Sequence, residues 1–209
     1  MKEKTNKSVG NIQRRSFDQL TWVNPKQVLI NYRHLELNFL DSLDQKVRTL
    51  RTNKLKEWRE ARDAALFSYG MANEVLKTPV LVAKSEKSDY DFIMKWIIEE
   101  KEFYCPVQLK ELPPDDINPN IQIENIFEKL KKYCGEHDLL VSIKINREIK
   151  SFDLNSFKNK ENLKISELWY FGCLNPEQSK WFLYGSILES NPSQYDFAYP
   201  KGKQNYALQ

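Results

Sequence analysis

The chain has 209 residues, enough to bury a core in one domain with a smaller extension at one end. Its hydrophobic share of 41% and aromatic share of 12% are typical of globular proteins and exclude a disordered, low-complexity chain. No apolar run reaches the roughly 18 residues that a membrane span needs, and the first residues are polar. We therefore expect a cytoplasmic protein with no membrane partner.

The formal net charge of +3 is too small to indicate a nucleic-acid ligand by itself, but its distribution is uneven. Between residues 46 and 62 the chain carries seven Lys and Arg residues against two Glu. Such a stripe can neutralise phosphates, and the alternative interpretation is a solvated helix face. The candidates for nucleic-acid contact in this stripe are Arg48, Arg51, Lys54, Arg59 and Arg62.

The cysteines and histidines form no recognisable metal or nucleophile motif. Cys105, Cys134 and Cys173 have spacings that match neither a C-x-x-C pair nor a zinc knuckle. His34 and His137 are far apart in the sequence. We expect the cysteines to be small buried apolar residues and the histidines to have structural roles.

The first part of the chain has a helical pattern. Residues 1–16 are polar and predict a loosely held arm. Apolar residues recur at mostly helical spacings between residues 25 and 50. The proline-free segment 46–76 predicts one long helix, or two helices joined near Asn53.

The period then changes to that of strands. We expect a short buried strand at 79–83, followed by a second and a third strand with turns between them. A helix and an apolar strand follow, which indicates a parallel crossover. These later segments are 91–98 and 103–112 for the strands, 121–133 for the helix and 139–145 for the final strand.

Two further apolar segments, 167–174 and 181–187, predict two strands, or a strand and a helix. From residue 191 the chain is rich in Pro, Tyr, Asn and Gln, which predicts an irregular tail. The expected organisation is an α/β core over 46–190, preceded by an arm and helical extension over 1–45.

The most informative motif is an acidic residue followed, one hairpin later, by Gln-x-Lys. Alternate side chains of a strand share a face, so Gln108 and Lys110 point the same way while Val107 and Leu109 point into a core. A hairpin can bring Asp91 beside them. A carboxylate, an amide or main-chain oxygen and a nearby ammonium suit one Mg²⁺ and an attacking water, which is the chemistry of phosphodiester hydrolysis.

The order helix, three meandering strands, helix and strand, with this motif, resembles the PD-(D/E)xK nuclease superfamily over roughly residues 59–147. The resemblance implies a restriction-endonuclease-like mixed central sheet flanked by helices. It makes Asp91 the first acid, Gln108 the residue in the second acidic position and Lys110 the lysine. The Gln in place of the more usual Glu or Asp is similar to the Mrr-type restriction enzymes.

The resemblance also implies a ligand set for Mg²⁺ or Mn²⁺. It consists of Asp91, Gln108, the Leu109 carbonyl and an acid from the preceding helix, for which we prefer Glu60. Two other helix acids, Asp63 and Glu74, are alternatives to Glu60. Asp89 similarly competes with Asp91 for the role of first acid.

The expected function is a metal-dependent DNA endonuclease of the restriction or recombination and repair type, and the resemblance suggests a homodimer. The first alternative is a catalytically inactive protein of this fold that binds DNA or another protein. The second is an unrelated α/β enzyme or ligand-binding domain in which the motif is a coincidence. The sequence contains no P-loop, G-x-G-x-x-G, G-x-S-x-G or H-E-x-x-H motif that would name its chemistry.

Overall fold

A seven-stranded sheet forms the centre of the computed structural model, and its strands neighbour one another in chain order. Neighbouring strands are antiparallel, except that β3, β4 and β5 run parallel to one another. The structure describes residues 17, 19–40, 55–85, 90–131, 133, 138–147 and 163–202. The strands are β1 (Val80–Lys84), β2 (Phe92–Ile98), β3 (Lys101–Leu112), β4 (Leu140–Ile145), β5 (Glu167–Cys173), β6 (Lys180–Gly185) and β7 (Ser193–Ala198).

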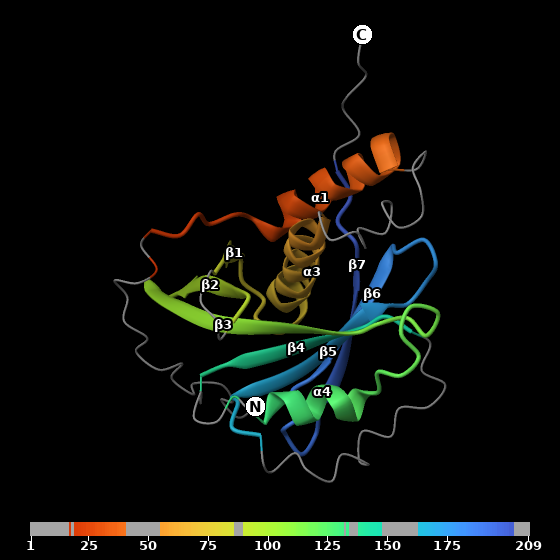
Figure 1. The fold of residues 1–209 in the computed structure, drawn as a ribbon. Coiled ribbons are helices and arrows are strands. Elements are labelled where there is room, and N and C mark those ends of the chain that lie inside the picture. The colour runs from red at the N-terminus through yellow and green to blue at the C-terminus, as the bar shows by residue number, and fades with distance from the viewer. Residues whose placement is uncertain are drawn as a thin grey trace.

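Helices cover both faces of this sheet. Figure 1 shows α1 and α3 on one side and α4 on the other. The expected mixed α/β architecture, with a central sheet flanked by helices, is confirmed. No helix in the described ranges is long and apolar enough to cross a membrane. The helices are α1 (Pro25–Leu35), α3 (Lys56–Gly70) and α4 (Ile123–Leu130), and π-helical segments η2 (Glu36–Leu40) and η4 (Met71–Val75) continue the first two.

Local sequence explains where α1 and α4 begin. The Asn24 side chain accepts a hydrogen bond from the Lys26 main-chain nitrogen at 2.9 Å, and Pro25 suits the first helical turn. At α4, the Gln122 main-chain nitrogen donates to Asn125 Oδ1 at 2.7 Å. The apolar side of α4 then packs on the sheet through Ile123, Ile126, Phe127 and Leu130.

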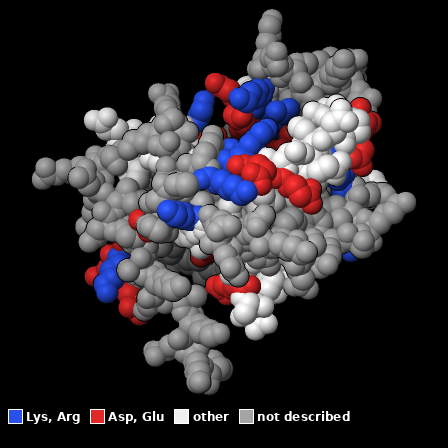
Figure 2. Space-filling model, turned by 60° about the horizontal axis from the view of Figure 1, so that its bottom comes forward, with Lys and Arg blue, Asp and Glu red and all other residues white. Residues whose placement is uncertain are grey.

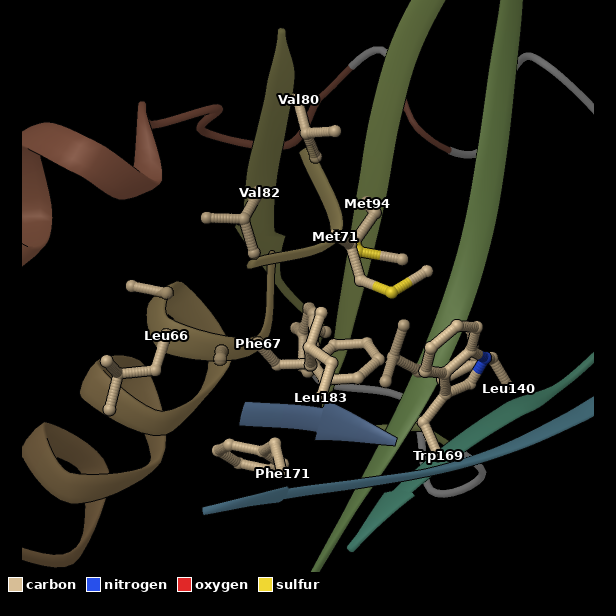
Figure 3. Close-up of a cluster of buried hydrophobic side chains, with 14 of the residues drawn as sticks. Leu66, Phe67, Met71, Val80, Val82, Met94, Leu140, Trp169, Phe171 and Leu183 are labelled. Carbon is tan, nitrogen blue, oxygen red and sulfur yellow. The ribbon is translucent and has the colours of Figure 1, made fainter. Parts of the chain in front are cut away.

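The larger core lies between the sheet and α3. Leu66 and Phe67 of α3 belong to one buried cluster with Trp169, Phe171 and Leu183 of the sheet, and Figure 3 shows Phe67 beside Leu183. These five side chains are almost fully buried. Burying side chains of this size contributes about 1.5–3 kcal/mol each, so this core fixes α3 on one face.

The described part of the C-terminal segment, residues 191–202, contributes to this core, so the prediction of an irregular tail from residue 191 was wrong for that part. It contains edge strand β7, whose Phe197 is buried. A Cβ added at Gly70, the last residue of α3, would lie 2.7 Å from Phe197 Cε1. Glycine therefore permits the close approach of α3 to β7.

Helix α1 also packs on the α3-side core. Leu29 is fully buried in the α3-side core, and the Tyr199 hydroxyl donates to the Leu29 carbonyl at 2.7 Å. Helix α1 and strand β7, which are far apart in the sequence, therefore lie together beside α3, as Figure 1 shows. Within the segment 1–45, predicted as an arm and helical extension, α1 thus packs against the core and shares its apolar interior.

The prediction of buried apolar cysteines holds for Cys105, which is 7% exposed and free. Burial raises the pKa of its thiol. Cys173 is free and half-buried, with its Sγ 2.9 Å from the Asn175 carbonyl oxygen. Cys134 and His137 lie outside the described residues.

Candidate functional site

The β2–β3 hairpin brings together residues that the sequence separates by 17 positions. Its turn consists of Glu99 and Glu100, both with positive φ, 48° and 64°, as a two-residue hairpin turn requires. The resulting register pairs Phe92 with Val107. Asp91 therefore lies opposite Gln108, one step further along the hairpin.

The Asp91 carboxylate binds two groups of β3. Oδ2 accepts a hydrogen bond from Gln108 Nε2 and another from the Leu109 main-chain nitrogen, the latter at 2.7 Å. Gln108 Nε2 also lies 3.3 Å from the Leu109 carbonyl oxygen. Both groups that donate to Asp91 are neutral, so they orient the carboxylate without cancelling its charge.

Tyr133 is a member of this cluster that the sequence analysis missed. Its hydroxyl donates to Gln108 Oε1 at 2.9 Å, and both side chains are 5% exposed. Tyr133 follows α4, and its main-chain nitrogen donates to the Leu130 carbonyl at 3.1 Å. Its position continues the buried stripe of Ile126 and Leu130 at helical spacing, and that periodicity is the signal that could have placed it against the sheet.

Lys110 lies on the same face of β3 as Gln108, as the strand period requires. Its Nζ is 5.7 Å from the centroid of the Tyr133 ring, within the range of a cation–π interaction. Lys110 and Asp91 are half-buried, so solvent reaches this part of the site. The structure thus brings Asp91, Gln108 and the Leu109 main chain together, and Tyr133 contacts Gln108 and Lys110 beside them.

Glu60 does not join this cluster. It lies in the first turns of α3, on the opposite side of the sheet from α4, with its carboxylate 3.5 Å from Lys56 Nζ. Gln108 and Lys110 instead project to the α4 side, where Leu112 of the same strand packs. The alternatives are also engaged elsewhere, because Asp63 binds Lys144 at 2.8 Å and Glu74 binds Lys77 at 3.1 Å.

The basic stripe lies only partly within the described residues. Of its candidate residues, Arg48, Arg51 and Lys54 lie outside them. Asp89, the alternative to Asp91 as first acid, also lies outside the described residues. Arg59 is half-buried on α3. Arg62 is 8% exposed and lies 3.3 Å from Glu36 and 3.5 Å from Asp63, so its guanidinium is not available to a phosphate.

The surface on the α4 side has charges of both signs. Figure 2 shows Lys and Arg beside Asp and Glu on the face that comes forward when the bottom of Figure 1 is turned toward the viewer. The described part of this face therefore does not present an extended patch of one sign. Interleaved charges favour local contacts with a ligand over long-range attraction of a polyanion.

The donors at Asp91 fit a hard cation, but they are few. A carboxylate, a side-chain amide and a main-chain carbonyl supply oxygen ligands of the kind that Mg²⁺ and Mn²⁺ prefer. No group of three or more His, Cys, Asp or Glu side chains that could hold a metal occurs among the described residues. A cation held here would need water or substrate oxygens to complete its coordination.

Comparison of the chain with protein-family models, with characterised protein sequences and with solved structures gave no match in any of the three searches. The geometry of the site is therefore the basis for inferring a function.

Proposed function

We propose that this protein is a Mg²⁺- or Mn²⁺-dependent endonuclease that hydrolyses DNA phosphodiester bonds, on a restriction-endonuclease-like core. The observation that carries the proposal is the meeting of Asp91 with Gln108 and the Leu109 main chain across the β2–β3 hairpin. Lys110 is on the same strand face. The proposal thus uses the full Asp and Gln-x-Lys pattern, together with the antiparallel register that brings its two parts together.

Each site residue has a role that its chemistry suits. Asp91, the Leu109 carbonyl and the Gln108 amide would hold the cation, which when bound polarises a phosphate and lowers the pKa of a water. Lys110 would stabilise the negative charge that develops on the phosphate and orient the attacking water. The Tyr133 ring restricts where the Lys110 ammonium can lie.

The basic stripe would contact DNA phosphates away from the cleaved bond. Arg48, Arg51 and Lys54 are the proposed phosphate contacts, whereas the buried ion pairs of Arg62 remove it from that set. Such contacts would supply salt-dependent affinity rather than sequence choice.

Cleavage of supercoiled, linear and branched DNA by the full chain, with Mg²⁺, Mn²⁺ or EDTA, tests the proposal. We expect divalent-dependent cleavage that falls by about 100-fold or more in Asp91→Ala and in Lys110→Ala. Asp196→Ala and Lys180→Ala change an exposed acid and an exposed lysine of β7 and β6, and serve as matched controls. Cleavage that persists in both site variants, or that is absent from the native chain, would overturn the proposal.

A non-catalytic protein of the same fold that binds DNA or a protein partner is the second candidate. Its specific support is that Gln108 brings no charge to the site and that the three candidate helix acids are ion-paired elsewhere. It predicts DNA or partner binding that neither Mg²⁺ nor EDTA alters. Fluorescence anisotropy with labelled duplex and branched DNA, alongside the cleavage assay, separates the two candidates.

A further inference from the structure

The Gln108 side-chain amide occupies the position where the candidate site would hold a cation. Its Nε2 lies between two oxygens, donating to Asp91 Oδ2 and lying 3.3 Å from the Leu109 carbonyl. An amide NH₂ group carries partial positive charge, so it satisfies these oxygens as a weak substitute for a cation. In this orientation the amide oxygen, the stronger ligand for Mg²⁺, points away toward Tyr133.

Tyr133 is the group that can accept the opposite orientation. A tyrosine hydroxyl both donates and accepts hydrogen bonds, whereas a main-chain N–H or C=O does only one of these. Rotation of the amide by half a turn exchanges Oε1 with Nε2, and Tyr133 then accepts from Nε2 where it previously donated to Oε1. The buried end of the amide keeps a hydrogen bond in both orientations.

We infer that the Gln108 amide reverses when a divalent cation binds, and that Tyr133 is the positioning residue that permits the reversal. Without a cation, the reversed amide would bring its oxygen toward Asp91 and the Leu109 carbonyl and would remove the donor that Nε2 supplies between them, so the observed orientation is preferred. A cation removes that conflict. This inference rests on the proposed cation site, but not on cleavage.

The side-chain NH₂ signals of Gln108 report the reversal directly. In the ¹⁵N-labelled full chain they are identified as the pair that is absent from Gln108→Glu. Titration with Mg²⁺ alone, without DNA, should shift this pair in a saturable way, and the shift should be absent from Asp91→Asn. Gln108 signals that stay unmoved while the Asp91 main-chain amide shows a saturable response would overturn the inference, as would the absence of any Mg²⁺ response.

The variant Tyr133→Phe keeps the ring beneath Lys110 and removes the hydroxyl. In the variant the buried N–H of the reversed amide has no acceptor, and an unpaired N–H costs more than the unpaired Oε1 that the observed orientation is left with, so the Mg²⁺ dissociation constant should rise by about 5-fold or more. Tyr184→Phe, on the same side of the sheet, is the matched control and should leave Mg²⁺ affinity unchanged. Equal Mg²⁺ affinity in native protein and Tyr133→Phe, with both folded by circular dichroism, would contradict the role of Tyr133.

The results also separate this inference from the proposed function. A Gln108 shift without cleavage of any DNA would support the reversal and overturn the nuclease. Divalent-dependent cleavage with unmoved Gln108 signals would support the nuclease and overturn the reversal.

Discussion

Two carboxylates on opposite sides of the sheet have different partners. Asp63, on the α3 side, is 7% exposed, with its Oδ1 2.8 Å from Lys144 Nζ and 3.5 Å from Arg62 Nε. Asp91, on the α4 side, is half-buried and receives its hydrogen bonds from a side-chain amide and a main-chain N–H. One carboxylate is thus neutralised by cations of the protein, while the other is oriented by neutral donors.

This difference separates an acid that holds the fold together from one that remains suited to a ligand. A buried ion pair needs both members, because either one alone would be a buried charge with no counter-charge. A carboxylate that neutral donors orient keeps its attraction for an added cation. Ion pairing therefore argues against Asp63 as a metal ligand and favours Asp91, and the variants Asp63→Asn and Asp91→Asn test this contrast.

The largest expected effect is on stability in Asp63→Asn. Lys144 is 4% exposed, so the variant leaves its ammonium buried beside a neutral amide, and we expect the free energy of unfolding to fall by about 3 kcal/mol. Urea denaturation at neutral pH measures this loss. Combining Asp63→Asn with Lys144→Met should recover most of it, since the buried ammonium is removed and Arg62 keeps its ion pair with Glu36.

The pH dependence of Asp63→Asn provides a second check. Burial lowers the pKa of the Lys144 ammonium, and Asp63 opposes that effect. In the variant, the unfolded chain binds a proton at this lysine over a pH range in which the folded chain does not. Stability should therefore rise as the pH is raised from 7 toward the ordinary lysine pKa. A stability loss that is independent of pH would contradict this explanation.

An intermediate effect is expected at high pH from Tyr32, which joins α1 to α3. Its hydroxyl donates to the Trp58 carbonyl at 2.6 Å, and burial raises its pKa to about 12. Between pH 10 and 12 the unfolded chain loses this proton while the folded chain keeps it, so stability falls as the pH rises. One such group lowers the free energy of unfolding by at most about 1.4 kcal/mol per pH unit.

Tyr32→Phe should remove this contribution and flatten the alkaline side of the stability profile. Thermal melts of both proteins between pH 9 and 11.5 measure the difference. If melting temperature falls with pH equally in the two proteins, the Tyr32 hydroxyl does not cause the loss of stability at high pH.

The smallest expected effect on stability is that of Asp91→Asn. The asparagine side-chain oxygen can still accept from the Leu109 main-chain N–H, so we expect a change of about 1 kcal/mol or less. Mg²⁺ should raise the melting temperature of the native chain and not of this variant, because a ligand stabilises only the protein that binds it. A loss as large as that of Asp63→Asn would place Asp91 among the structural acids.

Most of the elements could be predicted from local pattern. The strands at Val80–Lys84, Phe92–Ile98 and Leu140–Ile145 follow from short apolar runs between turn residues, and the parallel pairing of β3 with β4 follows from the helix between them. The tail could not be recognised this way. Its strand, Ser193–Ala198, has little apolar content and is held by pairing with β6 and by the contact of Phe197 with α3.

The site could be predicted only in part, for a related reason. Asp91, Gln108 and Lys110 lie on one short hairpin, where strand period and register determine which side chains meet. Glu60 and Tyr133 lie on other elements. Their distance from the hairpin depends on which face of the sheet each element covers, and a helical stripe does not specify that face.

The sequence by itself therefore determined the order of the core elements and the shared face of Gln108 and Lys110, because both depend on interactions between near neighbours. The tertiary structure decided that α3 packs on the far side, which excludes Glu60 and buries Arg62 among acids. It also decided that Tyr133 closes the site from the end of α4. These positions depend on which apolar faces of segments far apart in the sequence pack together, and a local sequence pattern does not specify that packing.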